Sequence, residues 1–338
     1  MSKLKETLKA SAVATVVMSG CHKWFLRRHR HDVTILMYHG FFEEDHADGL
    51  EQYGSRWCEI GDFKRQLNYL QRHANVISFE RLVKHYQTGA TLPNNAVVIT
   101  MDDGYASNYR LAYPLLKQWD IPACIFVSSR FVEHREFLWP DRIEYSIWKT
   151  DSDELEIVID NKSIRYRLVD EQSKIEAVDS IKQQLKPLCH RDRMSLIGQI
   201  EDNTGQTLSD QGETPALLEP LRWNEIGDMI ESNLVSIGSH TVRHPNLTTC
   251  TDEQLRDELV DSKALIAQRT GKACSLFCYP GGAYNARVKR FTEEAGYHCA
   301  VAIGGAFEKR DQTDLFELKR VSVARGMRKY GFIGQLLR

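Results

Sequence analysis

The chain has 338 residues, of which 42% are hydrophobic and 27% are charged, and its formal net charge is -2. These proportions are ordinary for a soluble globular protein built either as one large domain with an insertion or as two domains. A net charge this close to zero gives no general attraction to phosphate backbones, so we expect no nucleic-acid partner.

Residues 1–31 form a basic leader that is helical or signal-like. Its charged residues before position 31 are Lys3, Lys5, Lys9, Lys23, Arg27, Arg28 and Arg30, opposed by Glu6. This charge can bring the leader to an anionic membrane surface, although a solvated helix with an arginine-rich end explains the same pattern. The scattered cysteines favour a reducing compartment, so we expect a cytoplasmic or membrane-peripheral location.

An apolar run inside the leader, 10-ASAVATVVMSGC-21, is compatible with a second cellular location. It has the outline of a secretory signal but is too short to span a bilayer. Its last four residues resemble a lipoprotein cleavage box. The alternative location is therefore periplasmic, with the chain anchored through a lipid on Cys21.

From residue 32 on, strand-like and helix-like segments alternate. Short apolar runs predict strands at 33–39, 75–79, 96–100, 121–127, 234–238, 275–280, 299–304 and 321–324. Amphipathic spacing predicts helices at 63–74, 106–119, 252–269 and 285–296. This alternation, with strands that are apolar throughout, favours a parallel sheet that is either open or closed as a (β/α) barrel.

The segment 150–218 interrupts that alternation. Residues 155–168 alternate polar and apolar side chains around Asn161-Lys162, which predicts a hairpin, and 171–203 predicts two charged amphipathic helices. The expected organisation is therefore a leader at 1–31, a first part of the main domain at 32–149, an inserted hairpin and helices at 150–218, and a second part of the main domain at 219–338.

The strand predicted at 96–100 ends in two adjacent carboxylates, Asp102 and Asp103, followed by a glycine. Neighbouring like charges raise one another's pKa, and a carboxylate beside an apolar core loses hydration, so we expect a cation close by. An Asp-Gly hairpin turn would explain the pair without any chemistry. The helical spacing that follows favours strand, loop and helix instead.

A second polar cluster, 238-GSHTVRHPNL-247, also follows an apolar strand. His240 and His244 are four residues apart, so both imidazoles would lie on one face of a helical turn. Two imidazoles and one carboxylate can hold a catalytic divalent metal and leave positions open for water and substrate. Chance or capping explains the pair alone equally well, but together with the two acids it indicates a metal site.

Two more segments are expected at the same end of the predicted parallel sheet. In 277-FCYPGGAYN-285, Pro280 and Gly281 predict a tight loop whose backbone can approach a ligand closely, although it can also be a plain turn. His39 ends the first predicted strand and is either a site residue or a core histidine. Loops at the carboxyl ends of parallel strands are where barrels and open sheets hold their sites.

These phrases together resemble a known family. ITMDDGY, SHTVRH and FCYPGGAYN are similar, in order, to the Asp-Asp, His-Ser/Thr-x-x-His and Tyr-Pro-Gly motifs of the polysaccharide deacetylases, carbohydrate esterase family 4, also called NodB-homology proteins. The similarity runs from residue 33 to 324 and includes LMYHGF, Trp139 and LRWNEI. It implies an α/β fold, a distorted (β/α) barrel of seven or eight strands, here with a small inserted α+β subdomain.

The resemblance also implies a hydrolase that removes N-acetyl groups from N-acetylhexosamine units of a polysaccharide or glycan precursor. It makes Asp103, His240 and His244 the ligands of a divalent metal, with zinc expected and cobalt, nickel or manganese also compatible. It leaves Asp102 free of the metal as general base. A backbone N–H of the third motif, at Tyr284 or a neighbour, would hold the oxyanion.

The chain departs from the family pattern at two places. The late Leu-x-His motif that donates a proton in many members is absent, and His39 is expected to replace it, as the similar Tyr-His phrase of exopolysaccharide deacetylases implies. The arginine of the third motif is also absent, and Arg320 is expected to steady Asp102 from the last strand. The expected substrate-binding residues are Trp139, Pro280, Gly281 and Tyr284. Core packing explains Trp139 equally well.

Two other functions are compatible with these residues. A non-catalytic glycan-binding relative could retain the pocket without a working acid. A metal-dependent esterase or amidase could use the same site on another acyl substrate.

Overall fold

The computed structural model describes residues 28–336, except 47, 55, 160, 210–213, 306–307, 310, 312–313, 324, 326 and 328. Most of the basic leader and Cys21 therefore lie outside the described residues, and their predicted roles stay predictions.

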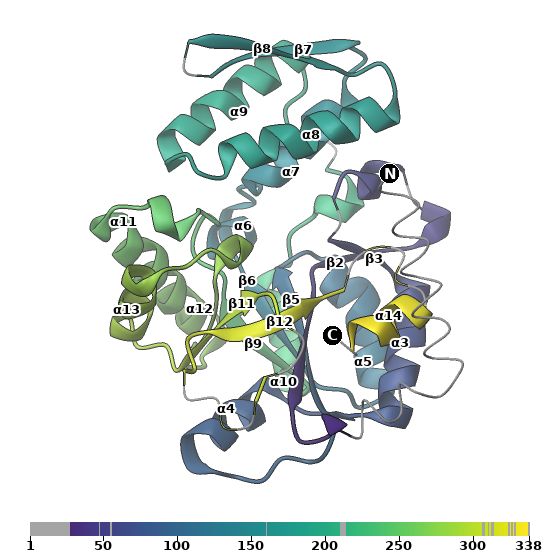
Figure 1. The fold of residues 1–338 in the computed structure, drawn as a ribbon, viewed down its shortest axis with the longest axis vertical. Coiled ribbons are helices and arrows are strands. Elements are labelled where there is room, and N and C mark those ends of the chain that lie inside the picture. Colours follow the sequence, from purple (N-terminus) through teal and green to yellow (C-terminus); the bar gives the residue numbers. More distant parts are fainter. Residues whose placement is uncertain are drawn as a thin grey trace.

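Seven parallel strands close into a barrel (Figure 1). Their order is β1 (Val33–Tyr38), β12 (Leu318–Ser322), β11 (Cys299–Ile303), β10 (Leu276–Cys278), β9 (Val235–Ser239), β6 (Ala123–Val127) and β5 (Ala96–Asp103), which pairs back with β1. A short strand, β4 (Asn75–Val76), pairs with the first residues of β5. The distorted (β/α) barrel that the family resemblance implied is confirmed.

The barrel strands are buried on both faces, as parallel strands covered by helices must be. Because side chains alternate along a strand, Val98, Thr100 and Asp102 of β5 share one face. On that face Val98 packs in the same apolar cluster as Phe126 of β6 and Val301 of β11. The alternate residues of the strands pack in a second cluster with the surrounding helices. Thr100 and Asp102 therefore continue an apolar interior stack towards the carboxyl end of the barrel.

Helices surround the strands. They are α3 (Ile60–His73), α4 (Phe79–Thr88), α5 (Tyr113–Gln118), α6 (Ser129–His134), α10 (Trp223–Glu231), α11 (Asp252–Arg256), α12 (Ser262–Thr270), α13 (Ala286–Glu294) and α14 (Lys329–Gln335). The predicted helix at 252–269 is divided by a π-helical segment, η6 (Asp257–Asp261), and the one at 106–119 begins with another, η3 (Asn108–Ala112). Thr251 and Gln254 form a capping box at the amino end of α11.

Several strand boundaries differ from the prediction. The strand predicted at 75–79 ends at Val76, because the Ser78 side chain caps the amino end of α4 by accepting a hydrogen bond from the Arg81 amide. The last strand, predicted at 321–324, begins at Leu318 and so includes Arg320. A small parallel pair, β2 (Gly40–Phe42) and β3 (Trp57–Glu59), was not predicted.

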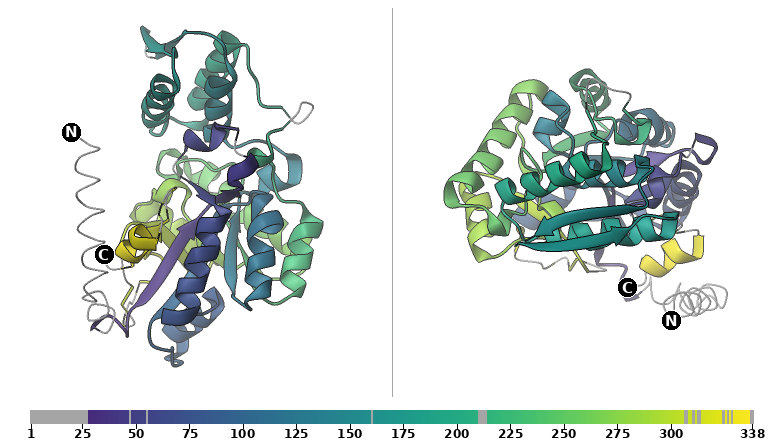
Figure 2. Two further views of the ribbon diagram at one scale, coloured as in Figure 1. Left: turned by 90° about the vertical axis from the view of Figure 1, so that its right-hand side faces the viewer. Right: turned by 90° about the horizontal axis from the view of Figure 1, so that it is seen from above.

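A separate unit follows β6 and stands at one end of the barrel, at the top in Figure 1 and in the left view of Figure 2. It contains α7 (Trp139–Lys149), the antiparallel hairpin β7 (Glu154–Ile159) and β8 (Lys162–Arg167), α8 (Glu171–Leu185) and α9 (His190–Thr204). It has its own apolar core, which includes Ile147, Ile157, Val178 and Ile197. We call the segment from β7 to α9 the inserted unit.

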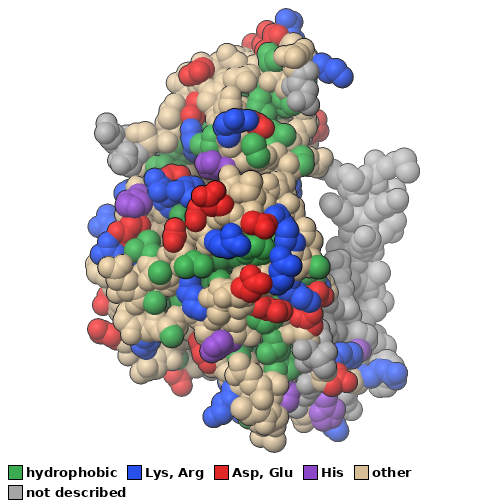
Figure 3. Space-filling view, turned by 90° about the vertical axis from the view of Figure 1, so that its left-hand side faces the viewer, with side chains coloured by type: hydrophobic (Ala, Val, Ile, Leu, Met, Phe, Trp, Pro, Cys, Tyr) green, Lys and Arg blue, Asp and Glu red, His purple; other side chains and the backbone are tan. Residues whose placement is uncertain are grey.

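The surface carries interspersed charges of both signs, as Figure 3 shows for one face. None of the described helices combines the length and the apolar character needed to cross a membrane.

Candidate metal centre and active site

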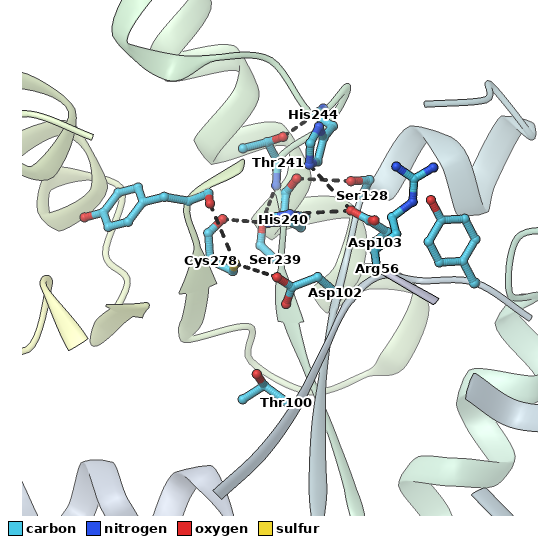
Figure 4. A network of polar contacts seen from close by, with 12 residues as sticks. Arg56, Thr100, Asp102, Asp103, Ser128, Ser239, His240, Thr241, His244 and Cys278 are labelled. Atoms are coloured by element: carbon cyan, nitrogen blue, oxygen red, sulfur yellow. Dashed lines mark hydrogen bonds and ion pairs between the residues drawn. The ribbon is translucent and has the colours of Figure 1, made fainter. Parts of the chain in front are cut away.

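Asp103, His240 and His244 converge from two strand ends (Figure 4). Asp103 is the last residue of β5, and the two histidines lie in the loop that follows β9. Asp103 Oδ1 lies 3.6 Å from His240 Nε2 and 3.5 Å from His244 Nε2. These separations exceed a hydrogen bond but are close to the roughly 3.4 Å expected between two ligand atoms that each lie about 2.1 Å from a tetrahedral metal.

The loop from Ser239 to His244 is not the helical turn that the four-residue spacing predicted. Thr241 and His244 have φ angles of 70° and 56°, in the left-handed region that non-glycine residues rarely adopt. The turn is held by the Thr241 hydroxyl, which accepts from the His244 amide, and by buried Glu258, whose carboxylate accepts from two backbone amides of the loop. Local side-chain hydrogen bonds, not helical repeats, bring both rings to one side.

Asp103 has the same kind of backbone distortion, with a φ of 76°. Its carbonyl accepts a hydrogen bond from the Ser128 amide, and the Ser128 hydroxyl donates to the carbonyl of His240. Ser128 therefore joins the backbones of two members of the cluster. Strained residues held by surrounding contacts are common at functional sites, because the strain fixes a side-chain direction that relaxed backbone would not give.

The donor set fits a divalent metal. His240 Nδ1 donates to the Cys278 carbonyl at 2.8 Å, which leaves Nε2 unprotonated and directed at Asp103. Burial lowers the pKa of His240 and of His244, so both imidazoles are neutral, as metal ligands must be. Burial raises the pKa of Asp103 well above its usual range, and its Oδ1 has no hydrogen-bond partner among the described residues. A cation at this point would satisfy that oxygen.

Asp102 lies beside this cluster but has a different partner. The Arg320 guanidinium of β12 donates from Nη1 to Asp102 Oδ1 at 2.7 Å and from Nη2 to Oδ2 at 2.6 Å. Burial alone would raise the pKa of Asp102, but the Arg320 charge outweighs this and holds that pKa well below its usual range. Asp102 is therefore ionised at any physiological pH. Arg320 reaches it from the last strand, as expected, and is placed to steady this carboxylate.

Two further polar groups complete the surroundings of Arg320. Nη1 also donates to the Thr100 hydroxyl, and Nη2 lies 3.0 Å from the Cys278 sulfur. The Cys278 sulfur is 3.5 Å from Asp102 Oδ2, and burial raises the pKa of this thiol well above its usual range. No role for Cys278 was predicted from the motifs, although it lies inside the third one.

His39 follows β1 and is partly exposed. Asp102, Arg320 and His240 all act electrostatically on the pKa of His39, so its side chain lies in the same cluster of polar residues. Its carbonyl accepts a hydrogen bond from Asn108. Burial lowers the pKa of His39 to about 3, so its ring is neutral at rest. The structure thus brings His39 to the site, while its role as acid stays a prediction.

The third motif forms the loop after β10. Pro280 and Gly281 belong to a short 3-10 turn, and Gly281 has a φ of 59°. The Tyr284 ring stacks on Tyr279, with ring centroids 4.9 Å apart, and its hydroxyl accepts a hydrogen bond from Lys319. The Tyr284 side chain is therefore engaged with its own loop and with β12, and its contact with substrate stays a prediction.

Trp139 is the first residue of α7. The Arg193 guanidinium of α9 lies 4.9 Å above its ring, and Trp139 packs against the apolar core of the inserted unit. These contacts explain its position by packing, the alternative that the sequence left open.

Sequence reasoning missed a buried ionic network next to Asp103. Arg56 forms ion pairs with Asp141 and Glu144 of α7, and Lys182 of α8 pairs with Glu144 at 2.8 Å. The Tyr105 hydroxyl donates to Asp141 at 3.0 Å. These residues are far apart in sequence. Tyr105 ends the ITMDDGY motif, but the others lie outside the three motifs, so no local pattern could have grouped them.

Comparisons with known proteins agree with the motifs. A family model described as polysaccharide deacetylase matches residues 89–300, more than half of the chain. Over 231 residues the chain is 24% identical to the "Putative polysaccharide deacetylase YxkH" of Bacillus subtilis (strain 168). The match covers 68% of this chain and 52% of that protein, so the chain spans about half of the relative's length.

Solved structures show a similar fold. The Streptococcus pyogenes deacetylase PplD in complex with acetate aligns with a TM-score of 0.60 and 16% identity, covering 90% of this chain and 98% of that one. IcaB from Ammonifex degensii aligns with a TM-score of 0.57 and 15% identity, covering 91% and 97%. At such identities the likeness concerns the fold, and the family assignment rests on the matching model and the motifs. The chain belongs to the polysaccharide deacetylase family.

Proposed function

We propose that the protein is a metal-dependent N-deacetylase that removes N-acetyl groups from N-acetylhexosamine units of a polysaccharide or glycan precursor. One observation carries this proposal. Asp103, His240 and His244 present three ligand atoms within 4.8 Å of one another, while the adjacent carboxylate of Asp102 is held apart by Arg320. A metal-binding triad next to a separate, ionised carboxylate is a sufficient arrangement for the hydrolysis of an amide.

Asp103, His240 and His244 would hold the metal, for which zinc is our first choice and cobalt, nickel and manganese are alternatives. Bound there, the metal would supply Lewis acidity towards an acyl oxygen and lower the pKa of water. The proton steps belong to the chain itself. Asp102, fixed by two hydrogen bonds from Arg320, accepts a proton from the attacking water.

His39 is the proposed proton donor to the leaving amine. Because burial lowers its pKa to about 3, the proton that it delivers has to reach it during the reaction. The proton taken up by Asp102 is the available source, and His39 interacts with the charge of Asp102. A backbone N–H of the third-motif loop, at Tyr284 or a neighbour, would donate to the developing oxyanion. The products are acetate and a free amine.

The substrate is proposed to be an N-acetylated glycan that contacts the third-motif loop at Pro280, Gly281 and Tyr284. We also propose that the protein works in the cytoplasm or at the membrane periphery, where the basic leader would contact anionic lipid. Fractionation of cells that express the whole chain, with and without residues 1–31, tests the location. Recovery of a lipid-modified form at Cys21 would favour the periplasmic alternative.

The test of the activity combines metal analysis of the purified protein with an acetate-release screen over N-acetylglucosamine oligomers and lipid-linked N-acetylated sugars. We expect acetate release by the unaltered protein and its loss in Asp102→Asn, which should still bind metal. Release from O-acetylated but not N-acetylated substrates would favour the esterase alternative. Binding of glycans without any acetate release would favour a non-catalytic relative.

A further inference from the structure

The ionic network beside Asp103 connects the metal centre to the inserted unit. Arg56 donates two hydrogen bonds to Glu144, at 3.0 and 2.7 Å, and a further one to Asp141. The side chains of Asp141 and Glu144 are both 0% exposed. Buried carboxylates of this kind have to be paired and fixed in place, because an unpaired buried charge is strongly destabilising.

Tyr105 joins this network to the metal-binding aspartate. Its hydroxyl lies 3.0 and 3.1 Å from the two oxygens of Asp141, and the same hydroxyl lowers the pKa of Asp103, against the stronger effect of burial. Tyr105 is fully buried, with the Trp57 ring 4.8 Å and the Phe131 ring 5.5 Å from its own. Packing therefore fixes the ring and holds its hydroxyl against the Asp141 carboxylate.

The far end of the network lies in the inserted unit. The Lys182 ammonium of α8 donates to Glu144 at 2.8 Å and approaches the Tyr53 carbonyl at 3.5 Å. Direct contacts thus run from Lys182 through Glu144, Arg56 and Asp141 to Tyr105, whose hydroxyl acts on the nearby Asp103 carboxylate. Arg56 lies beside Asp103 in Figure 4, and its positive charge opposes the burial that raises the pKa of this carboxyl.

We propose that Tyr105 is a positioning residue for the metal-ligating carboxylate of Asp103, and that the inserted unit supports it through Lys182, Glu144, Arg56 and Asp141. This inference rests on the metal site of the proposed function, but it assigns the inserted unit a task that the triad alone does not reveal. Groups that orient a metal ligand control metal affinity, because an unsupported ligand spends less time in the binding geometry.

The first arm of the test compares two tyrosine variants. Tyr105→Phe removes only the hydroxyl that donates to Asp141 and acts on Asp103. Tyr113→Phe is the matched control, because Tyr113 is also buried and its hydroxyl donates to the Asp228 carbonyl on the outer side of the barrel. Co²⁺ and Zn²⁺ affinities are measured by chelator competition on the metal-free full chain, and the absorption spectrum of bound Co²⁺ reports its coordination.

The second arm compares two lysines of α8. Lys182→Met breaks the network, whereas Lys174→Met removes an ammonium that instead donates to the carbonyls of Trp148 and Thr150. Both changes loosen the attachment of α8 to α7, but only Lys182 contacts Glu144. Lys182→Arg keeps a cation at that position and should restore metal binding. Thermal unfolding of each variant verifies that it is folded.

We expect Tyr105→Phe to weaken metal binding about 10-fold or more with an altered Co²⁺ spectrum, and Tyr113→Phe to stay within about twofold of the unaltered protein. Lys182→Met should weaken binding in the same direction, Lys182→Arg should recover it, and Lys174→Met should not change it. Unchanged metal affinity in Tyr105→Phe, or equal losses in the two lysine-to-methionine variants, would overturn the inference. If the unaltered protein binds neither metal, the metal site of the proposed function is itself refuted.

Discussion

Arg320 and Asp102, which are 218 residues apart in the sequence, form a two-bond ion pair inside the barrel, and both side chains are almost completely buried. The pair places a fixed positive charge behind the carboxylate that adjoins the metal triad. Asp102 is therefore kept ionised and oriented by the barrel interior, whereas one oxygen of Asp103, the next residue, has no hydrogen-bond partner in the part of the chain that the structure describes. The two adjacent aspartates therefore differ in their partners and in their pKa values, which are lowered for Asp102 and raised for Asp103.

This pair predicts a strong energetic coupling. Arg320→Met should reduce the free energy of unfolding by about 3–5 kcal/mol at neutral pH, because it leaves the Asp102 charge buried and unpaired. Asp102→Asn combined with Arg320→Met should cost about 1–3 kcal/mol less than the sum of the single changes. Urea unfolding of the metal-free protein measures all four corners of the cycle. Additive losses would show that the two side chains do not interact as the structure has them.

Substitutions of the two aspartates should differ in how much bound metal stabilises the folded protein. Saturating Zn²⁺ at about a thousandfold over its Kd should stabilise the folded chain by about 4 kcal/mol, because the metal binds only the folded site. Asp102→Asn should keep most of this stabilisation, whereas Asp103→Asn should lose it. Thermal unfolding with and without a chelator provides the measurement, and each variant is the control for the other. Loss of the metal response in both would argue against separate roles for the neighbours.

The lowered pKa of His39 leads us to expect that the free energy of unfolding depends on pH. Its pKa is about 3 in the folded protein, below the ordinary value of 6.5, so between these values the unfolded chain binds more protons. Stability from this group is therefore fully present above pH 6.5 and is lost as the pH falls from 6.5 towards 3, with a slope of at most about 1.4 kcal/mol per pH unit. His39→Gln should flatten the curve of unfolding free energy against pH in that window. A slope identical to that of the unaltered metal-free protein would contradict the prediction.

The third-motif loop provides a matched pair of glycines. Gly281 and Gly282 both have positive φ angles, 59° and 68°, so alanine at either position should cost about 1–2 kcal/mol. A Cβ at Gly281 would meet open space, whereas one at Gly282 would lie 2.9 Å from the Ile303 side chain and backbone. Gly282→Ala should therefore be less stable than Gly281→Ala by about 1–3 kcal/mol, as in other overpacked sites. Urea unfolding compares the two directly, and equal losses would indicate that the loop shifts to make room.

Much of the barrel could be predicted from local patterns. Continuous apolar runs identified strands such as 96–100 and 299–304, because a strand covered on both sides buries all of its side chains. Boundaries were less predictable where two local signals competed, as at Ser78, where a helix cap ended a strand early. The convergence of Asp103, His240 and His244 was predictable because motif residues at the carboxyl ends of parallel strands lie at one end of the barrel.

The sequence by itself determined the alternation of strands and helices, the family, and the identity of the residues that gather at the barrel mouth, because these depend on short-range spacing. The tertiary structure alone decided how the two histidines face one carboxylate, since they do so through a strained loop and not a helical turn. It also decided that Tyr105, Arg56 and Lys182 form one network reaching Asp103. Contacts between side chains far apart in the chain depend on packing and on pairing of buried charge, and no local pattern encodes them.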